Sequence, residues 1–377
     1  MLNNTKITLI TSNYPMITFP ERGVFVEALA QQWKKMDVSI SVINPVSFQN
    51  QFRYGKVKAF EIFNSIPVYR PTYISYSNYR FLGFNTNYFS QISFVNAALK
   101  ICNKIEKPDL YYGKFLMGSG FAASLAGEKF KKPSFADLGE SKLLESYSEK
   151  DKYNAKKIIK SLTGIICVSE RLQKEVLELG AKPENVFLAP NEANTELFKK
   201  KDKTECRKKL GLPENSFIVA FTGHFIERKG PLRVLKAIEA LGDKVYGVFL
   251  GRGKQIPTGQ KVLFAGALPN NELPDWLCAS DVFVFPTLAE GHCNAINEAI
   301  ACELPIITSD ISDMKEQLGE KAAIFVNPHD IREISNSISK IMTNNDFANQ
   351  LISASKNNEK PARGKKIADW MFQKIEG

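Results

Sequence analysis

Two glutamates eight positions apart are the most informative chemical feature of the chain. Glu290 and Glu298 enclose the segment Gly-His-Cys-Asn-Ala-Ile-Asn. The apolar run Asp281–Pro286 before them predicts a buried parallel strand, and Ala295–Cys302 predicts a helix. The first carboxylate is therefore expected in a strand-to-helix loop and the second within the helix. Backbone N–H groups at a helix start bind phosphate, and carboxylates bind hydroxyl groups, so this arrangement suits a phosphorylated sugar.

Turns containing glycine follow three further predicted strands in the same half of the chain. Gly223 opens a turn after Phe217–Thr222, and Arg228 and Lys229 in that turn place two cations where a diphosphate needs them. The other two turns are Gly251-Arg252-Gly253 and Phe264-Ala265-Gly266-Ala267-Leu268, and the last can meet a flat base with backbone groups. Together with the glutamate segment, these turns predict a nucleotide-sugar site.

Length and composition favour a globular protein with two domains. The chain has 377 residues, of which 44% are hydrophobic and 24% charged. It contains no apolar run of about 18 residues, and its start lacks the features of a signal peptide, so a cytoplasmic location is expected. The cysteines form no C-x-x-C pair, which favours buried, reduced thiols. They are Cys102, Cys167, Cys206, Cys278, Cys293 and Cys302.

Positive charge is concentrated in the first half. Residues 1–190 hold 25 Lys/Arg and 16 Asp/Glu, whereas residues 191–377 hold 25 and 24. A basic face can attract anionic lipid headgroups, nucleic acid or a polyanionic acceptor. A lysine-rich surface without a specific partner is the alternative explanation.

Short apolar strands alternate with amphipathic helices through both halves, which predicts two parallel sheets covered by helices. The predicted strands are Lys6–Thr11, Ser39–Ile43, Ile66–Tyr69, Leu110–Tyr112, Pro133–Ala136, Gly164–Val168, Asn185–Leu188, Phe217–Thr222, Val245–Leu250, Lys261–Ala265, Asp281–Phe285, Pro305–Ser309 and Ala322–Val326. The predicted helices are Val24–Lys35, Ser90–Ile105, Gly120–Lys129, Lys150–Lys160, Glu170–Leu179, Leu232–Leu241, Leu273–Ala279, Ala295–Cys302, Ile331–Met342, Asp346–Asn357 and Lys360–Ile375.

The pattern restarts after a lysine-rich stretch, Lys199–Lys209, which is a plausible linker. We therefore expect a first Rossmann-like domain over residues 1–190, a second Rossmann-like domain over 191–358, and a last helix over 359–377. The fold class is α/β, with a ligand cleft expected at the carboxyl ends of the strands.

Residues 48–94 are dense in aromatic side chains. They could line an acceptor groove or dip into a membrane surface, and ordinary core packing is the alternative. The residues concerned are Phe48, Phe52, Tyr54, Phe60, Phe63, Tyr69, Tyr73, Tyr76, Tyr79, Phe81, Phe84, Tyr88, Phe89 and Phe94.

These motifs together resemble a retaining glycosyltransferase of family 4, with the GT-B architecture of two facing Rossmann-like domains and a C-terminal helix that crosses back to the first. Glu290-x7-Glu298 is similar to the family's E-x7-E motif, and Gly223–Gly230 to its phosphate turn. Pro190-Asn191 with Glu196-Leu197-Phe198 resembles its hinge, although Glu192 stands where glycine is usual. The resemblance covers essentially the whole chain.

The resemblance implies a role for each matching residue. Glu290, Lys229 and Arg228 would act at the reaction centre, and Glu298 would bind the ribose hydroxyls. Backbone groups of residues 292–294 would hold the sugar and the distal phosphate, and the small Gly23 would let the diphosphate approach. The full set of implied donor-binding residues is Gly23, Gly223, His224, Gly251, Arg252, Gly266, Ala267, Leu268, His292, Cys293, Asn294, Ala295 and Glu298.

The resemblance also implies the partners. A hexose would pass from a nucleotide diphosphate sugar, UDP-linked by expectation, to a lipid-linked or polysaccharide acceptor. The anomeric configuration of the sugar would be retained because the acceptor attacks the same face that the diphosphate leaves. No metal and no separate cofactor would be needed. No nucleic acid partner is expected, and a peripheral place at the inner membrane face would suit the basic first half.

A departure from the family and a separate glycine motif favour alternatives. The family often carries a histidine that faces the sugar after the fifth strand of the first domain; here Asp137 or Glu140 is expected in that place. An impaired GT-B partner protein is therefore one alternative. An NAD(P)-dependent oxidoreductase is another, because Gly118-Ser119-Gly120-Phe121-Ala122-Ala123 fits G-x-G-x-x-A.

Overall fold

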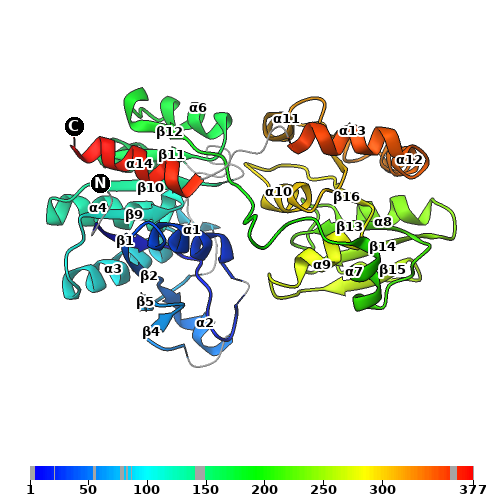
Figure 1. Cartoon of the computed structure of the whole chain (residues 1–377). Helices are drawn as coiled ribbons and strands as arrows, with labels where there is room; N and C mark the ends of the chain where they lie inside the picture. The colour runs from blue at the N-terminus through cyan, green and yellow to red at the C-terminus, as the bar shows by residue number, and fades with distance from the viewer. Residues whose placement is uncertain are drawn as a thin grey trace. The chain divides into compact units, whose positions relative to one another are not determined.

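The structure is a computed structural model that describes residues 5–20, 22–53, 57–76, 80–81, 84–85, 87–140, 149–356 and 363–376. Side chains of residues 52–53, 80–81, 84–85 and 149–151 are not part of this description. The aromatic side chains of Phe52, Tyr54, Tyr79, Phe81 and Phe84, and the predicted helix start at Lys360, therefore lie outside the described residues. The chain divides into two compact units, Met1–Ala189 with Ala362–Gly377, and Pro190–Pro361 (Figure 1).

The first unit is built on an eight-stranded sheet in the order β12-β11-β10-β9-β1-β2-β5-β4, parallel except for the β4–β5 pair. The strand order reverses between β1 and β9. Its strands are β1 (Lys6–Ile10), β2 (Ser39–Ile43), β4 (Phe60–Phe63), β5 (Ile66–Tyr69), β9 (Leu110–Lys114), β10 (Ser134–Leu138), β11 (Gly164–Cys167) and β12 (Val186–Leu188). Two short pairs are separate: β3 (Val46–Ser47) with β6 (Thr72–Tyr73), and β7 (Arg80–Phe81) with β8 (Phe84–Asn85).

Alternate residues of these strands face opposite sides, so both faces of the sheet are buried. Leu9, Val42 and Phe135 pack in one cluster with helices α1 and α14, and neighbouring strand residues pack under α3, α4, α5 and α6. The helical segments of this unit are α1 (Val24–Lys34), α2 (Phe48–Arg53), α3 (Asn87–Lys104), η1 (Leu116–Gly120), α4 (Phe121–Phe130), α5 (Glu149–Ser161), α6 (Glu170–Glu178), η2 (Pro183–Asn185) and α14 (Arg363–Glu376).

The last helix, α14, packs on the first unit through an aromatic and an apolar contact surface. The Trp370 ring stacks on Phe187 with 5.0 Å between ring centroids, and Trp33 Nε1 donates a 2.8 Å hydrogen bond to the Gly364 carbonyl. Ile367 and Met371 are fully buried between α14 and the sheet. The end of the chain therefore completes the core of the first unit.

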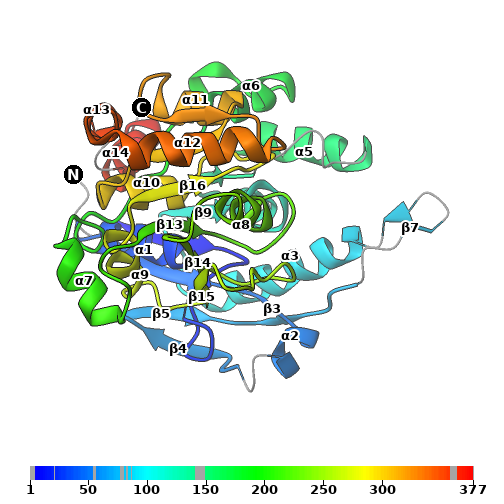
Figure 2. The same ribbon diagram turned by 90° about the vertical axis from the view of Figure 1, so that its right-hand side faces the viewer.

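The second unit has a six-stranded parallel sheet in the order β15-β14-β13-β16-β17-β18, which is the Rossmann order. Helices α8 and α12 pack side by side against it (Figure 2). Its strands are β13 (Phe217–Thr222), β14 (Val245–Leu250), β15 (Val262–Gly266), β16 (Val282–Phe285), β17 (Ile306–Ser309) and β18 (Ile324–Val326). Its helices are α7 (Lys203–Leu210), α8 (Pro231–Glu239), α9 (Leu273–Cys278), α10 (Asn294–Ala301), α11 (Ser312–Leu318), α12 (Ile331–Thr343) and α13 (Asn345–Lys356).

The α/β class with parallel-sheet, Rossmann-like domains is confirmed, and two local predictions are corrected. The lysine-rich stretch predicted as a linker contains helix α7, whose first turn is capped by a 2.9 Å hydrogen bond from the Glu205 N–H to Asp202 Oδ1. Helix α11 was not predicted at all. The sheet order places β13 and β16 side by side where the order reverses, so the turns that follow them lie next to each other.

Candidate active site

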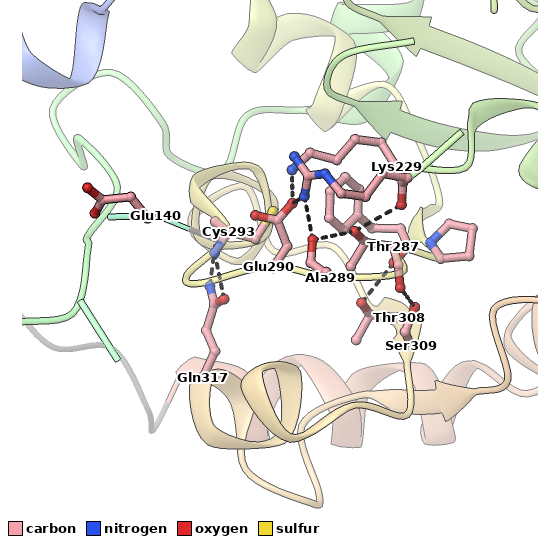
Figure 3. Close-up of polar contacts among 12 residues, drawn as sticks. Glu140, Lys229, Thr287, Ala289, Glu290, Cys293, Thr308, Ser309 and Gln317 are labelled. Carbon is pink, nitrogen blue, oxygen red and sulfur yellow. Dashed lines mark hydrogen bonds and ion pairs between the residues drawn. The ribbon is translucent and has the colours of Figure 1, made fainter. Parts of the chain in front are cut away.

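Two turns at the switch point of the second sheet bring three charged side chains together. Lys229 and Arg228 follow β13, and Glu290 follows β16. Both cations contact the same oxygen, Glu290 Oε1: Lys229 Nζ forms an ion pair with it, and Arg228 Nη1 lies 3.0 Å away (Figure 3). No partner is recorded for Glu290 Oε2 among the described residues, so this oxygen remains available to a substrate hydroxyl.

Hydroxyl groups fix the backbone that carries Glu290. Thr287 Oγ1 donates to the carbonyls of Arg228 and Ala289, both at 3.2 Å, and thus joins the two turns. The Thr287 carbonyl in turn accepts a 2.6 Å hydrogen bond from Ser309 Oγ at the end of β17. Neither Thr287 nor Ser309 was singled out in the sequence, although a buried threonine directly after a strand end is a usable signal.

Burial controls the ionisation of Lys229. Its side chain is mostly buried and its Nζ lies 5.0 Å from the centroid of the Phe285 ring. Burial is the main cause that lowers the pKa of Lys229 to about 8, and Arg228 acts in the same direction. With a pKa of about 8, most of the ammonium group is charged at neutral pH. Two cations share one carboxylate, which leaves one positive charge in excess.

Helix α10 begins at Asn294, four residues after Glu290. Asn294 and Ala295 occupy its first two positions, and Asn294 Oδ1 is buried without a hydrogen-bond partner in the described part of the chain. Glu298 lies one turn further along and is half-buried, which raises the pKa of its carboxyl to about 7. Its carboxylate has no recorded hydrogen bond or ion pair with any described residue. Asn294 Oδ1 thus lies at the positive end of the helix dipole, and Glu298 follows one turn later.

The backbone of Cys293 is less available than its sequence position suggested. Its N–H donates a 2.9 Å hydrogen bond to Gln317 Oε1, and its carbonyl accepts one of 2.9 Å from Gln317 Nε2 (Figure 3). The expected phosphate contact from the Cys293 N–H is therefore corrected, because this donor is already used. Burial raises the pKa of the Cys293 thiol. The His292 side chain is half-buried in the same turn.

The glycine turns after β13 and β14 approach each other closely. A Cβ on Gly251 would lie 1.9 Å from the Gly223 carbonyl oxygen, so only glycine fits there. The Gly251 N–H donates to the Gly266 carbonyl at 2.8 Å, so the three turns form one continuous strip. His224 and Ala267 are exposed along this strip, whereas Arg252 and Leu268 are half-buried. The pKa of His224 is lowered by desolvation, Arg252, Lys229 and Arg228, in that order.

Gly23 is required by the backbone of the first unit. It precedes α1 with φ of 71°, and a Cβ on it would lie 2.5 Å from the Asn13 backbone carbon and oxygen. The space left by the missing side chain is thus filled by the protein's own chain. A role for Gly23 at the diphosphate stays a prediction.

Asp137 is a structural carboxylate rather than a sugar-facing one. It is fully buried. Its carboxylate accepts hydrogen bonds from Tyr112 Oη at 2.6 Å and Arg363 Nη2 at 2.8 Å, and forms an ion pair with Lys114 Nζ at 2.7 Å. Burial alone would raise the pKa of Asp137, but Arg363 and Lys114 hold it at about 2. The prediction that Asp137 faces the sugar is corrected, because its oxygens are used to join β9, β10 and α14.

Glu140 is held by the backbone of its own unit. Its carboxylate accepts hydrogen bonds from the N–H groups of Leu116, at 2.7 Å, and Gly139, at 2.9 Å, and burial raises its pKa. The adjacent Gly118-Ser119-Gly120 turn is buried, and its Gly120 N–H donates to the Phe115 carbonyl. The Gly120 N–H is thus not free for a dinucleotide pyrophosphate, which argues against the oxidoreductase alternative. A sugar-facing role for Glu140 stays a prediction.

Metal-ligating groups are not clustered in the described ranges. No set of three or more His, Cys, Asp or Glu side chains there could hold a metal ion. All six cysteines are free and buried. None of the described helices is long and apolar enough to cross a membrane.

The chain is similar to known glycosyltransferases. Residues 202–358 match the family model described as Glycosyl transferases group 1. The teichuronic acid biosynthesis protein TuaC of Bacillus subtilis (strain 168), named as a glycosyltransferase, is 28% identical over 89% of this chain and 88% of its own. An Escherichia coli UDP-Gal:alpha-D-GlcNAc-diphosphoundecaprenol alpha-1,3-galactosyltransferase is 32% identical over 41% of this chain and 44% of its own.

The fold is shared with a protein whose structure was solved with bound ligands. Anabaena Alr3699/HepE, in complex with UDP and glucose, superposes with a TM-score of 0.74 at 16% identity, over 98% of this chain and 100% of that one. The sheet order and the switch-point site define a GT-B protein. The family match over residues 202–358 and the likeness to TuaC along most of the chain support a group 1 glycosyltransferase.

Proposed function

We propose that the chain is a retaining, metal-independent hexosyltransferase of family 4 that uses a UDP-linked sugar. The observation that carries this proposal is the convergence of Arg228, Lys229 and Glu290 at the switch point, beside the start of α10. In doubly wound folds, ligands bind at this place. The excess positive charge and the helix dipole suit a diphosphate, and the unpaired carboxylate of Glu298 suits the ribose hydroxyls.

The reaction divides charge between two groups. The bond between the anomeric carbon and the distal phosphate oxygen breaks, and its electron pair stays on the phosphate. Lys229 and Arg228 stabilise that negative charge. A fixed donor of this kind lowers the activation barrier by about 3 kcal/mol. Glu290 Oε2 accepts a sugar hydroxyl and orients the ring. In this scheme the acceptor oxygen bonds to the same face of the carbon, and its proton passes to the departing phosphate oxygen.

Two features support an acceptor at a membrane surface. Residues 1–190 carry a net charge of +9. Large hydrophobic side chains of the aromatic-rich stretch are exposed, whereas others there, such as Phe94, are buried in the core. The exposed ones are Phe48, Phe60, Ile62, Ile74, Tyr76 and Phe89. The names of two relatives, which refer to teichuronic acid biosynthesis and to a diphosphoundecaprenol acceptor, agree with a lipid-linked or polysaccharide acceptor.

Donor hydrolysis and transfer assays test this proposal. We expect the full chain to release UDP from a UDP-hexose in the presence of EDTA, and to act weakly on GDP- and ADP-sugars. The anomeric configuration of the product, followed by proton NMR, must match that of the donor. Failure to bind any of the three nucleotides would remove the proposed function. Flotation with phosphatidylglycerol vesicles, compared with phosphatidylcholine vesicles, tests the membrane part.

A further inference from the structure

Gln317, on helix α11, makes three hydrogen bonds to the start of helix α10. Its Oε1 accepts from the Cys293 N–H at 2.9 Å, and its Nε2 donates to the Cys293 carbonyl at 2.9 Å and to Asn297 Oδ1 at 2.8 Å. Both hydrogen bonds to Cys293 involve its backbone, so the peptide groups on either side of this residue are held in one orientation. Cys293 is also the N-cap of α10, where serine, threonine, aspartate or asparagine is usual and cysteine provides no capping hydrogen bond.

The direction of these hydrogen bonds is determined. Asn297 Nδ2 donates to the Asn191 carbonyl at 2.8 Å, so Asn297 Oδ1 must face Gln317 as an acceptor. Gln317 must then present its Nε2 to two oxygens and its Oε1 to one N–H. A side chain with two carboxylate oxygens, or with none, cannot satisfy this set.

We propose that Gln317 is a positioning residue for the donor site. It holds the turn between Glu290 and Glu298, and thereby sets the direction of the N–H groups that start α10 relative to Lys229 and Arg228. This inference rests on the proposed function, because the group positioned by this turn is the distal phosphate of the donor. Gln317 itself touches no substrate.

Nucleotide binding by the full chain tests this role, with UDP and UMP as probes. Gln317→Met keeps the side-chain length and removes all three hydrogen bonds, and Gln317→Glu keeps the shape but turns a second oxygen against the Cys293 carbonyl. We expect either variant to weaken UDP binding about tenfold. UMP lacks the distal phosphate, so its affinity changes less. Gln350→Met, at an exposed position of α13, is the matched control and leaves both affinities unchanged.

Thermal unfolding and hydrogen exchange separate positioning from folding. We expect the Cys293 amide to exchange faster in both variants, while the unfolding temperature changes little. Equal weakening of UDP and UMP, or wild-type UDP affinity in both variants, overturns the inference and leaves the proposed function intact. If Gln317→Met does not fold, Gln317→Glu alone decides by the same criterion. Absence of UDP binding by the wild-type chain overturns the proposed function first, and this inference with it.

Discussion

Lys229 and Glu290 form an ion pair across the switch point of the second sheet, from turns that follow the adjacent strands β13 and β16. The pair is mostly buried, and Arg228 adds a second cation on the same carboxylate oxygen. Glu290 is therefore the internal counter-ion of the cations that we propose bind the diphosphate. An incoming diphosphate therefore competes with Glu290 for Lys229 and Arg228.

Replacing Lys229 by methionine removes the ammonium group and keeps most of the apolar stem. We expect kcat/KM for the donor to fall at least about a hundredfold, because the leaving diphosphate loses a fixed, largely desolvated cation. Steady-state kinetics with a UDP-sugar measure this. Lys254→Met, at an exposed lysine of the same unit, is the control and should keep full activity. Equal activities of the two variants would place the leaving-group charge elsewhere.

Glutamine in place of Glu290 and of Glu298 should give different kinetic results. Glu290→Gln frees two cations from their counter-ion, so we expect tighter UDP binding but a kcat lowered by about a hundredfold or more, since the sugar loses its orienting carboxylate. Glu298→Gln removes a nucleotide contact, so we expect weaker binding with a smaller change in kcat.

Calorimetry with UDP and single-turnover kinetics distinguish these two outcomes. If both variants weaken UDP binding equally and leave kcat unchanged, both glutamates are nucleotide contacts. An unchanged pathway product in cells that carry Glu290→Gln would favour the alternative of an impaired partner protein.

Two shifted pKa values predict a narrow pH range for donor binding. Burial raises the pKa of Glu298 to about 7, so its carboxylate is lost as the pH falls below that value. Burial lowers the pKa of Lys229 to about 8, so its charge is lost as the pH rises above it. UDP affinity should therefore be highest between about pH 7 and pH 8.

Two variants show which residue causes the fall in UDP affinity at low pH and which causes the fall at high pH. Lys229→Arg keeps its charge above pH 8, because a guanidinium group does not titrate there, and should remove the alkaline fall. Glu298→Gln should remove the acid fall. A UDP affinity that does not change between pH 6 and pH 9 would contradict both assignments.

Much of the second unit could be predicted from its sequence. The apolar strands end in glycine turns, and those turns carry the charged residues, so Lys229 and Glu290 were expected near each other. The pattern at Phe217–Thr222 and Asp281–Phe285 was long and apolar enough to predict strands β13 and β16. Only the order of the sheet, which pairs these two strands, shows why their turns meet.

The partners of these residues could not be predicted. Gln317 lies on α11, a helix of seven residues with little apolar periodicity, so neither the helix nor the glutamine was recognised. Asp137 was expected to face a sugar, because it lies where the family often carries a sugar-facing histidine. Its burial depends on Arg363, which is distant in sequence and reaches it only after α14 docks on the first unit. Long-range pairings of this kind leave no local sequence signal.

The Asp137 cluster predicts a measurable loss of stability. Asp137→Asn removes the counter-ion of Lys114 and Arg363, both of which are buried, and we expect the free energy of unfolding to fall by about 3–5 kcal/mol. The folded-state pKa of Asp137 is held at about 2, below its unfolded value of about 3.9. The higher free energy of unfolding of the wild type is therefore present above about pH 4 and is lost as the pH falls toward 2. Urea unfolding at pH 7 and at pH 3 measures both effects.

The control is Asp369→Asn, at an exposed position of α14, which should match the wild type at either pH. A gap between Asp137→Asn and the wild type that stays the same from pH 7 to pH 3 would show that lost packing, rather than the missing charge, causes the instability.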